Sequence, residues 1–257
     1  MSRRRAKRIG VVYTPPPRET PAAGTVGPAA PRAFRPEYIN RLAQLFKKHL
    51  PVEHRFVCIA DSTEGFSSGV HVIETPPEAL DMAGWRSPEG NRFPACYRRL
   101  WAQSYAAMKV LSERVLLIDA DLIPVNNMTP IVQRDEPFVG WRPFRDWGRK
   151  MRIGGGIYLF SPGAHATIWE RFRADPRGVI AAARGAGFRG SDQAVLSYFL
   201  ADKVPVYGRD SGIYSIRDLD ERHMLPKDAR LVQFNGPVKP WEYRGPATWV
   251  AERWHGR

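Results

Sequence analysis

Short apolar runs alternate along the chain with stretches of helical apolar spacing. The runs that predict strands cover residues 8–14, 56–60, 70–73, 115–118, 138–141, 157–160, 204–207 and 231–234. Helical spacing covers residues 37–50, 97–111, 164–172 and 191–200. Strands that alternate with helices predict an α/β fold with a mixed, mostly parallel central sheet flanked by helices. Residues 1–257 contain no repeat and no domain-sized linker, so we expect one domain.

The apolar run at residues 115–118 is followed at once by Asp119 and Asp121. Four consecutive apolar residues are typical of a strand buried on both faces, and on a continuing strand the two carboxylates would point to one side. A divalent cation is the simplest partner for them, because hard cations prefer oxygen ligands and bridge carboxylates to phosphates. The alternative is a strand that simply ends in a polar loop.

Two further motifs lie downstream, each with a structural alternative. Glycines at residues 154–156 precede an apolar run, where they would let a ligand approach the backbone or would mark a bend. Asp192 and Gln193 stand at the start of a helical pattern. Ser191 or Asp192 could instead be a helix N-cap, so this motif by itself leaves both interpretations open.

The charge of the chain points to an anionic partner. The net charge is +13. Residues 1–7 form a basic tail, which we interpret as solubilising. Lys239 lies between two prolines after the strand at residues 231–234, and a lysine on a stiff turn favours a phosphate contact. Residues 15–35 are rich in proline, alanine and glycine and are expected to form a loop.

The chain shows the features of a cytoplasmic protein. Cys58 and Cys96 have no metal-type spacing and are expected to be reduced packing residues. No apolar run approaches the roughly 20 residues of a membrane span. The basic start is followed by an apolar run too short for a signal sequence, so we expect no export.

Taken in order, four motifs resemble glycosyltransferase family 8. They are the Asp-x-Asp pair, the glycine-containing strand, the Asp-Gln pair before a helix, and the Phe-x-Gly-x-x-Lys-Pro-Trp segment. The family contains glycogenin-like, retaining nucleotide-sugar transferases of the GT-A fold, with bacterial and phage relatives. The resemblance runs from residue 8 to about residue 242. It implies a GT-A fold and transfer of a sugar from a nucleotide-diphosphate donor, with a UDP-sugar expected first, to a glycan, lipid or protein acceptor.

The resemblance also implies roles for individual residues. Asp119, Asp121 and Gln233 would hold the cation, expected to be Mn²⁺ with Mg²⁺ as the alternative. Asp192 and Gln193 would lie beside the reacting sugar carbon and act in catalysis. The residues that would bind the nucleotide sugar are Tyr13, Thr14, Arg99, Ala120, Gly155, Gly156, Asn235, Gly236 and Lys239.

The chain departs from the family pattern at two positions. Gln233 stands where the family usually has a histidine ligand; a glutamine oxygen coordinates hard cations but binds Mn²⁺ more weakly than imidazole does. Gly154 stands where the pattern has an asparagine, which removes one sugar contact. The proline-rich residues 15–35 replace a short nucleotide-binding turn and are expected to act as a lid or an acceptor-binding loop.

Two rival functions are compatible with parts of the sequence. A metal-dependent nucleotidyltransferase also uses paired carboxylates, but the first strand leads into prolines rather than a glycine-rich, lysine-bearing loop. A basic nucleic-acid-binding protein would use the charge and the aromatic and basic residues interleaved at 141–149. We interpret that stretch as a sugar-binding loop. A second Asp-x-Asp pair, Asp218 and Asp220, follows no buried strand and is not expected in the site.

Overall fold

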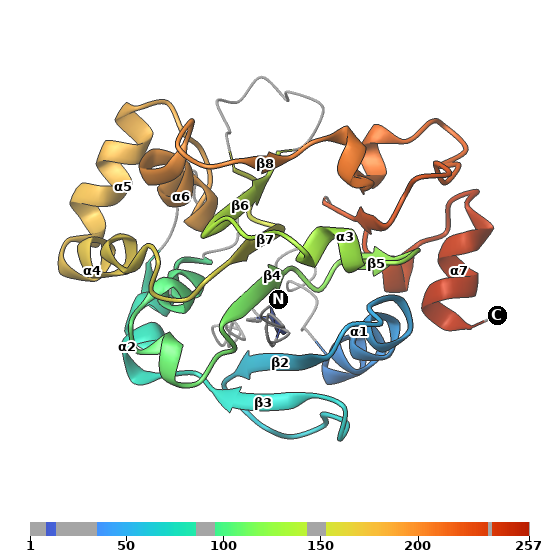
Figure 1. Ribbon diagram of the computed structural model, residues 1–257, viewed down its shortest axis with the longest axis horizontal. Helices are drawn as coiled ribbons and strands as arrows, with labels where there is room; N and C mark the ends of the chain where they lie inside the picture. The colour runs from blue at the N-terminus through green and yellow to red at the C-terminus, as the bar shows by residue number, and fades with distance from the viewer. Residues whose placement is uncertain (1–8, 14–34, 86–95, 143–152, 236–237, 257) are drawn as a thin grey trace, which may run out of the picture.

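The computed structural model describes residues 9–13, 35–85, 96–142, 153–235 and 238–256 of the 257-residue chain. Its centre is a seven-stranded sheet in the order β3-β2-β1-β4-β7-β6-β8 (Figure 1). The strands are β1 (Ile9–Tyr13), β2 (His54–Ala60), β3 (His71–Glu74), β4 (Arg114–Ile118), β6 (Phe138–Trp141), β7 (Ile157–Phe160) and β8 (Val206–Tyr207). Strand β7 runs antiparallel to both of its neighbours, and the other neighbouring pairs are parallel. The predicted mixed, mostly parallel sheet is therefore confirmed.

A second sheet has three strands in the order β5-β10-β9. These are β5 (Leu122–Pro124), β9 (Ile213–Ser215) and β10 (Leu231–Gln233), with β10 antiparallel to β5 and parallel to β9. The chain leaves the large sheet at the end of β4 and enters the small sheet at β5. The three residues between the two strands, 119–121, therefore lie where the two sheets meet.

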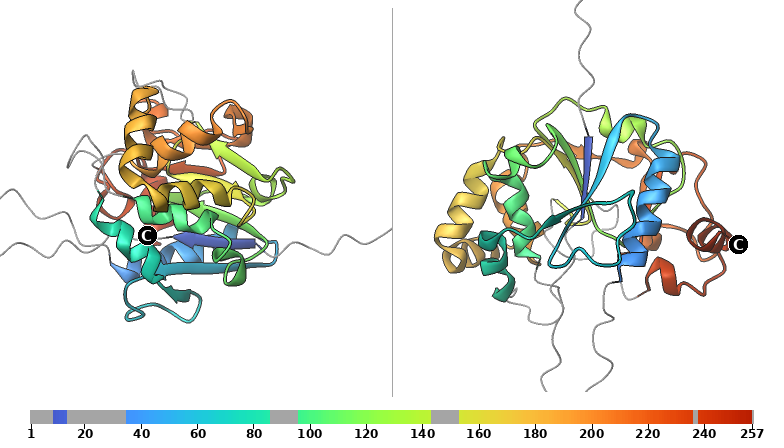
Figure 2. Two further views of the ribbon diagram at one scale, coloured as in Figure 1. Left: turned by 90° about the vertical axis from the view of Figure 1, so that its left-hand side faces the viewer. Right: turned by 90° about the horizontal axis from the view of Figure 1, so that it is seen from below.

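Helices cover both faces of the large sheet. Helix α1 (Pro36–His49) packs on one face, and α4 (Ala166–Ala174), α5 (Pro176–Gly185) and α6 (Asp192–Leu200) lie on the other (Figure 2). The shorter helices are α2 (Pro77–Leu80) and α3 (Thr129–Val132), and α7 (Thr248–His255) lies near the carboxyl terminus. None of the helices in the described part of the chain is both long and apolar enough to cross a membrane.

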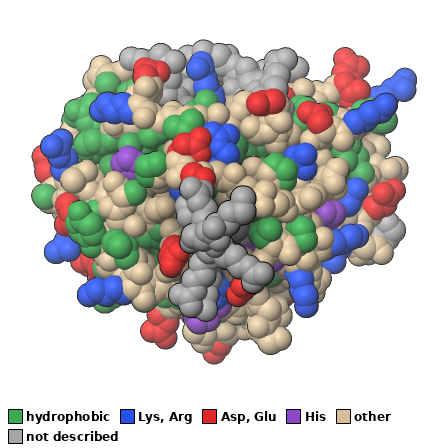
Figure 3. All heavy atoms as spheres, in the orientation of Figure 1, with side chains coloured by type: hydrophobic (Ala, Val, Ile, Leu, Met, Phe, Trp, Pro, Cys, Tyr) green, Lys and Arg blue, Asp and Glu red, His purple; other side chains and the backbone are tan. Residues whose placement is uncertain are grey.

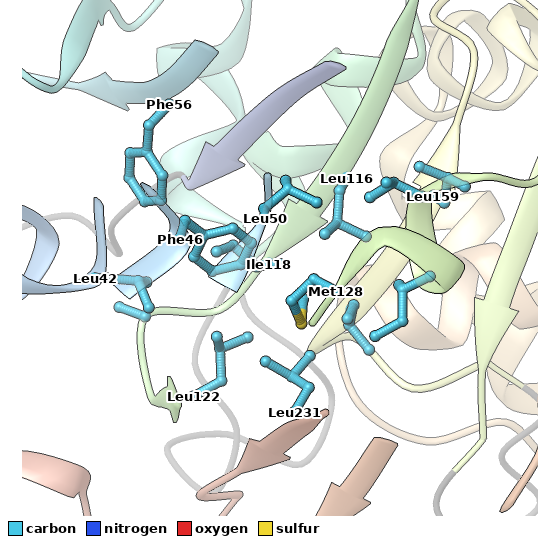
Figure 4. Packing of buried hydrophobic residues seen from close by; sticks show 14 of the residues in the cluster. Leu42, Phe46, Leu50, Phe56, Leu116, Ile118, Leu122, Met128, Leu159 and Leu231 are labelled. Atoms are coloured by element: carbon cyan, nitrogen blue, oxygen red, sulfur yellow. The ribbon is translucent and has the colours of Figure 1, made fainter. Parts of the chain in front are cut away.

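Strand β4 is the centre of the core. Leu116 and Ile118 face the layer that contains α1, whereas Val115 and Leu117 face the layer that contains α4 and α6. All four side chains are fully buried. Figure 4 shows Leu116 and Ile118 among side chains of α1, β5 and β10. The prediction of a strand buried on both faces is confirmed.

Helix α1 forms where its sequence predicts. Pro36 stands at its first turn, where a missing N–H is tolerated. Lys47, Lys48 and His49 occupy its last turn, where cations interact favourably with the helix dipole. Its buried face carries Ile39, Leu42, Ala43, Leu45 and Phe46.

The prediction of one long helix over residues 97–111 is wrong. Two 3-10 helices, Tyr97–Gln103 and Ala107–Lys109, replace it. Ser104 separates them in an extended conformation, and its hydroxyl accepts a hydrogen bond from the N–H of Ala107 at 3.1 Å. A serine hydroxyl that satisfies a nearby backbone N–H competes with the helix hydrogen bond, which explains the break.

The elements that the sequence did not predict include α2, α3, α5, α7, β5 and β9. Helix α5 did carry a start signal, because Asp175 accepts a hydrogen bond from the N–H of Gly178 at 2.8 Å and Pro176 occupies the first turn. Strand β9 is only three residues long, which is too short to identify by alternation.

Candidate functional site

The carboxyl ends of β1, β2 and β4 lie side by side at one edge of the large sheet. Asp119 is the first residue after β4, and its N–H donates to the carbonyl oxygen of Gly156 at 2.8 Å. Gly156 immediately precedes the antiparallel strand β7. The first carboxylate and the glycine motif therefore meet at the edge where ligands of α/β sheets bind.

Both carboxylate oxygens of Asp119 have protein partners. Arg99 Nη1 donates to Oδ1 at 2.8 Å, and Gln233 Nε2 donates to Oδ2 at 3.2 Å. Arg99 Nη2 also donates to the carbonyl oxygen of Gly155 at 2.7 Å, and Arg99 Nη1 lies 3.5 Å from Asp192 Oδ2. The Arg99 side chain is only 4% exposed, so one buried guanidinium joins three separate segments of the chain.

The charge of Arg99 is held by its carboxylate neighbours. Burial disfavours the cation, but Asp119 and Asp192 outweigh that penalty and raise the pKa of Arg99 well above its usual value. Burial also raises the pKa of Asp192, and the Arg99 guanidinium opposes this shift. The two groups therefore depend on each other for their charged forms.

Asp121 forms an ion pair with Lys239 through Oδ2. Its carbonyl oxygen accepts a hydrogen bond from the N–H of Phe234 at 2.7 Å, which fixes it beside the end of β10. Burial raises the pKa of Asp121 to about 6, and Lys239 opposes that shift in part. Oδ1 is buried, and none of the described residues donates a hydrogen bond to it. A buried carboxylate oxygen without a donor is destabilising unless a ligand reaches it.

Gln233 is the last residue of β10 and lies between Asp119 and the glycine motif. Its Oε1 is buried and has no hydrogen-bond partner within the described ranges. Gly156 packs so closely against this side chain that a Cβ at residue 156 would overlap it. The absence of a Cβ at Gly156 therefore makes room for the Gln233 side chain.

Asp192 and Gln193 begin α6 beside this cluster. Asp192 is 2% exposed and accepts a hydrogen bond from the hydroxyl of Ser191 at 3.2 Å. Gln193 Oε1 accepts from the N–H of Gly155 at 3.2 Å. Ser191 occupies the N-cap position without making a side-chain cap bond. The alternative of a plain capping motif therefore does not describe this stretch.

The structure brings most of the predicted site residues into one set of contacts. These are Arg99, Asp119, Asp121, Gly155, Gly156, Asp192, Gln193, Gln233 and Lys239. Ala120 lies buried between the two carboxylates. Asn235 hydrogen-bonds Ser215 of β9. Of Tyr13 the structure gives only the backbone, at the end of β1, and Thr14 and Gly236 lie outside the described residues.

Sequence reasoning missed a second arginine–carboxylate pair. Arg98 Nη1 donates to Asp61 Oδ1 at 3.0 Å, and the Arg98 side chain is 2% exposed. Asp61 follows β2 just as Asp119 follows β4, and β1 lies between these strands. Two adjacent arginines thus pair with carboxylates on either side of the carboxyl end of β1. The position of Asp61 directly after an apolar run was the available signal.

Asp119, Asp121 and Gln233 fit a hard cation by donor type. They offer two carboxylates and an amide oxygen, and two of their oxygens are buried without a partner among the described residues. No group of three or more His, Cys, Asp or Glu side chains arranged to hold a metal occurs in the part of the chain that the structure describes. A cation here would therefore depend on Gln233 or on oxygens from a bound ligand.

The other candidates of the sequence have structural roles. Asp218 accepts from the N–H of Ser215, and Asp220 accepts from the N–H of Met224 at 2.8 Å, so each carboxylate satisfies a nearby backbone N–H. Cys58 and Cys96 are free thiols, and burial raises the pKa of each to about 12.

Solved structures that resemble this chain are glycosyltransferases. An active-site mutant of LgtC, with glutamate in place of a glutamine, superposes with a TM-score of 0.63 at 15% identity, over 97% of this chain and 94% of that one. The galactosyltransferase LgtC in complex with donor and acceptor sugar analogs gives a TM-score of 0.60 at 15% identity, over the same shares of the two chains. The apo form of GlyE from Streptococcus pneumoniae TIGR4 gives 0.58 at 13% identity, over 98% of this chain and 60% of GlyE.

These likenesses establish the fold. The chain has the GT-A fold found in these glycosyltransferases, and this confirms the fold that the resemblance implied. No family model matches the sequence, and no curated protein matches it.

Proposed function

We propose that this chain is a glycosyltransferase related to family 8. It transfers a sugar from a nucleoside-diphosphate donor, with a UDP-sugar expected first, to an acceptor hydroxyl, with a divalent cation assisting and the anomeric configuration retained. The observation that carries the proposal is the convergence of Asp119, Asp121, Asp192, Gln233 and Lys239 at the carboxyl edge of the sheet.

Transfer of a sugar releases a diphosphate, whose negative charge must be stabilised as the bond breaks. Lys239 is the group suited to this task, because it is 32% exposed beside the carboxylates and its ammonium turns on a flexible stem. Arg99 is buried and its two terminal nitrogens contact Asp119, Gly155 and Asp192, so it acts by holding these groups in place. This changes the role expected for Arg99 from a diphosphate contact to a positioning residue.

Asp119, Asp121 and Gln233 would hold the cation. When bound, the cation neutralises the departing diphosphate and orients it. Asp192 shares Arg99 with Asp119, and Gln193 contacts the backbone of Gly155. In that position they would face the sugar, where a carboxylate supports the positive charge that develops on the ring.

The fold comparisons support this assignment by analogy. LgtC is a galactosyltransferase studied with donor and acceptor sugar analogs, and one of its active-site mutants changes a glutamine. The Asp192–Gln193 pair would supply the corresponding amide here. Fold alone does not determine the reaction, so the proposal rests on the cluster of side chains.

A nucleic-acid-binding function is less well supported. Trp141, one of the aromatic residues expected to stack on bases, is 2% exposed and belongs to the core of β6. Residues 143–149 of that stretch lie outside the described residues. Figure 3 shows Lys and Arg side chains interspersed with Asp and Glu on one face, without a continuous basic field.

A thermal-shift screen tests the proposed function. UDP-, GDP-, ADP-, CMP- and TDP-sugars are each added with and without Mn²⁺. A donor at a hundredfold excess over its Kd should stabilise the fold by about 2.7 kcal/mol. One nucleotide that raises the Tm, and does so more with Mn²⁺, supports the donor site and identifies the base. No shift with any donor, together with a shift by oligonucleotides, would reject the proposal.

A further inference from the structure

Lys239 forms an ion pair with Asp121, a carboxylate that a bound cation would need as a ligand. Its Nζ pairs with Oδ2 of Asp121, while the other oxygen of that carboxylate is buried and receives no hydrogen bond from the described part of the chain. Asp121 is 13% exposed and Lys239 is 32% exposed, so the pair is largely shielded from solvent. Electrostatic interactions in such a site are stronger than at the open surface.

The second carboxylate of the pair is occupied as well. Asp119 is held by Arg99 on one oxygen and by Gln233 on the other. Each carboxylate of the Asp-x-Asp pair thus has its own positive partner within the protein. Their mutual repulsion, from which the sequence predicts a cation, is already offset by Arg99 and Lys239.

A divalent cation and the Lys239 ammonium compete for Asp121. A cation ligated by Asp121 would lie only a few ångströms from an ammonium on the same carboxylate, and like charges at that separation repel strongly in a shielded site. Arg99 cannot move aside, because its two terminal nitrogens also hold Gly155 and Asp192. Lys239 can, because it is partly exposed on a flexible stem.

We propose that Lys239 is the resident counter-ion of Asp121, so that the ligand-free protein binds divalent cations weakly. A diphosphate provides the anionic oxygens that draw Lys239 away and complete the coordination of the cation. Cation and diphosphate therefore bind together. The second part of this inference rests on the proposed function, whereas the competition between Lys239 and the cation does not.

Titration of the ligand-free protein with Mn²⁺ tests the competition. Electron paramagnetic resonance measures free Mn²⁺ directly, without reference to activity. Lys239→Met keeps the apolar stem and removes the charge, and it should tighten Mn²⁺ binding at least about tenfold relative to wild type. Lys227→Met, at an exposed lysine in a turn, is the matched control and should leave the Mn²⁺ affinity unchanged. Equal or weaker binding by Lys239→Met would overturn the proposal.

The double variant Asp121→Asn/Lys239→Met tests whether the tighter Mn²⁺ binding of Lys239→Met depends on the Asp121 carboxylate. It should lose the tighter binding, because the freed carboxylate is absent; tight binding that persists would place the cation elsewhere and reject the inference. Lys239→Gln serves as a second neutral variant, and the Tm of each protein establishes that it folds.

The same wild-type protein is also assayed with the nucleotide-sugar series. If a donor raises the Tm but Lys239→Met binds Mn²⁺ no more tightly than wild type, only the counter-ion role is rejected. If Lys239→Met binds Mn²⁺ more tightly but no donor raises the Tm, the proposed function is rejected.

Discussion

Gly156 and Gln233 are in direct contact: a Cβ on Gly156 would lie 1.7 Å from Gln233 Nε2. Because real Cβ atoms do not approach neighbours so closely, the glycine is required for Gln233 to reach Asp119. Gly156 directly precedes β7, and Gln233 is the last residue of β10. The contact therefore ties the large sheet to the small sheet inside the candidate site.

Gly156→Ala should displace Gln233 and strain both strands. Overpacking of this kind costs about 1–3 kcal/mol, or several degrees in Tm. Gly185→Ala is the matched control, since a Cβ there meets no atom within 4 Å, and alanine is favoured over glycine in a helix by about 0.5–1 kcal/mol. Differential scanning calorimetry of the two variants should give opposite signs. Equal melting temperatures for Gly156→Ala and wild type would contradict the contact.

Removal of Arg99 should be severely destabilising. Arg99→Met leaves Asp119 and Asp192 without their shared cation in a buried position, which typically costs about 3–5 kcal/mol. Arg99→Lys should recover part of this loss, because an ammonium keeps the charge but cannot make all three contacts. Urea denaturation measures both values. The control is Arg134→Met, which breaks a partly exposed pair with Glu136 and should change stability by about 0–1 kcal/mol.

Asp121→Asn should reduce sugar transfer by at least about a hundredfold, because one anionic ligand of the proposed cation and the partner of Lys239 are both lost. The variant should still melt cooperatively. The rate is measured with whichever donor shifts the Tm, as transfer or as slow hydrolysis of the donor. Asp220→Asn, which retains a cap for Met224, should keep full activity. Full activity of Asp121→Asn would remove Asp121 from the site.

Stability should decrease in mild acid through His49. Burial, assisted by Arg253 and Lys48, lowers the pKa of His49 from 6.5 to about 4. The unfolded chain therefore binds a proton at a higher pH than the folded chain does, so the contribution is complete above pH 6.5 and is lost between pH 6.5 and 4.

His49→Gln removes this group and should flatten the dependence of Tm on pH in that window. His71→Gln, at an exposed position of β3, is the control and should follow the wild-type curve. Parallel curves for His49→Gln and wild type would show that another group accounts for the acid sensitivity.

The sequence determined the α/β class, the positions of most strands along the chain and the burial of β4, because the periodicity of apolar residues reflects local burial directly. It did not determine the break at Ser104, where a hydroxyl competes with a helix bond. The break depends on one side chain, and the apolar spacing over residues 97–111 continues across it.

The sequence also placed Asp119 and Asp121 together at a strand end, but their partners were decided by tertiary structure. Gln233 reaches Asp119 across 114 residues of chain, and Lys239 reaches Asp121 across 118. These pairs exist because β10 pairs with β5 in one register, which sets Gln233 opposite Leu122 beside the carboxylates. A pattern along the chain records which residues are charged and where strands end. Which charge offsets which depends on distances that only the folded sheets fix.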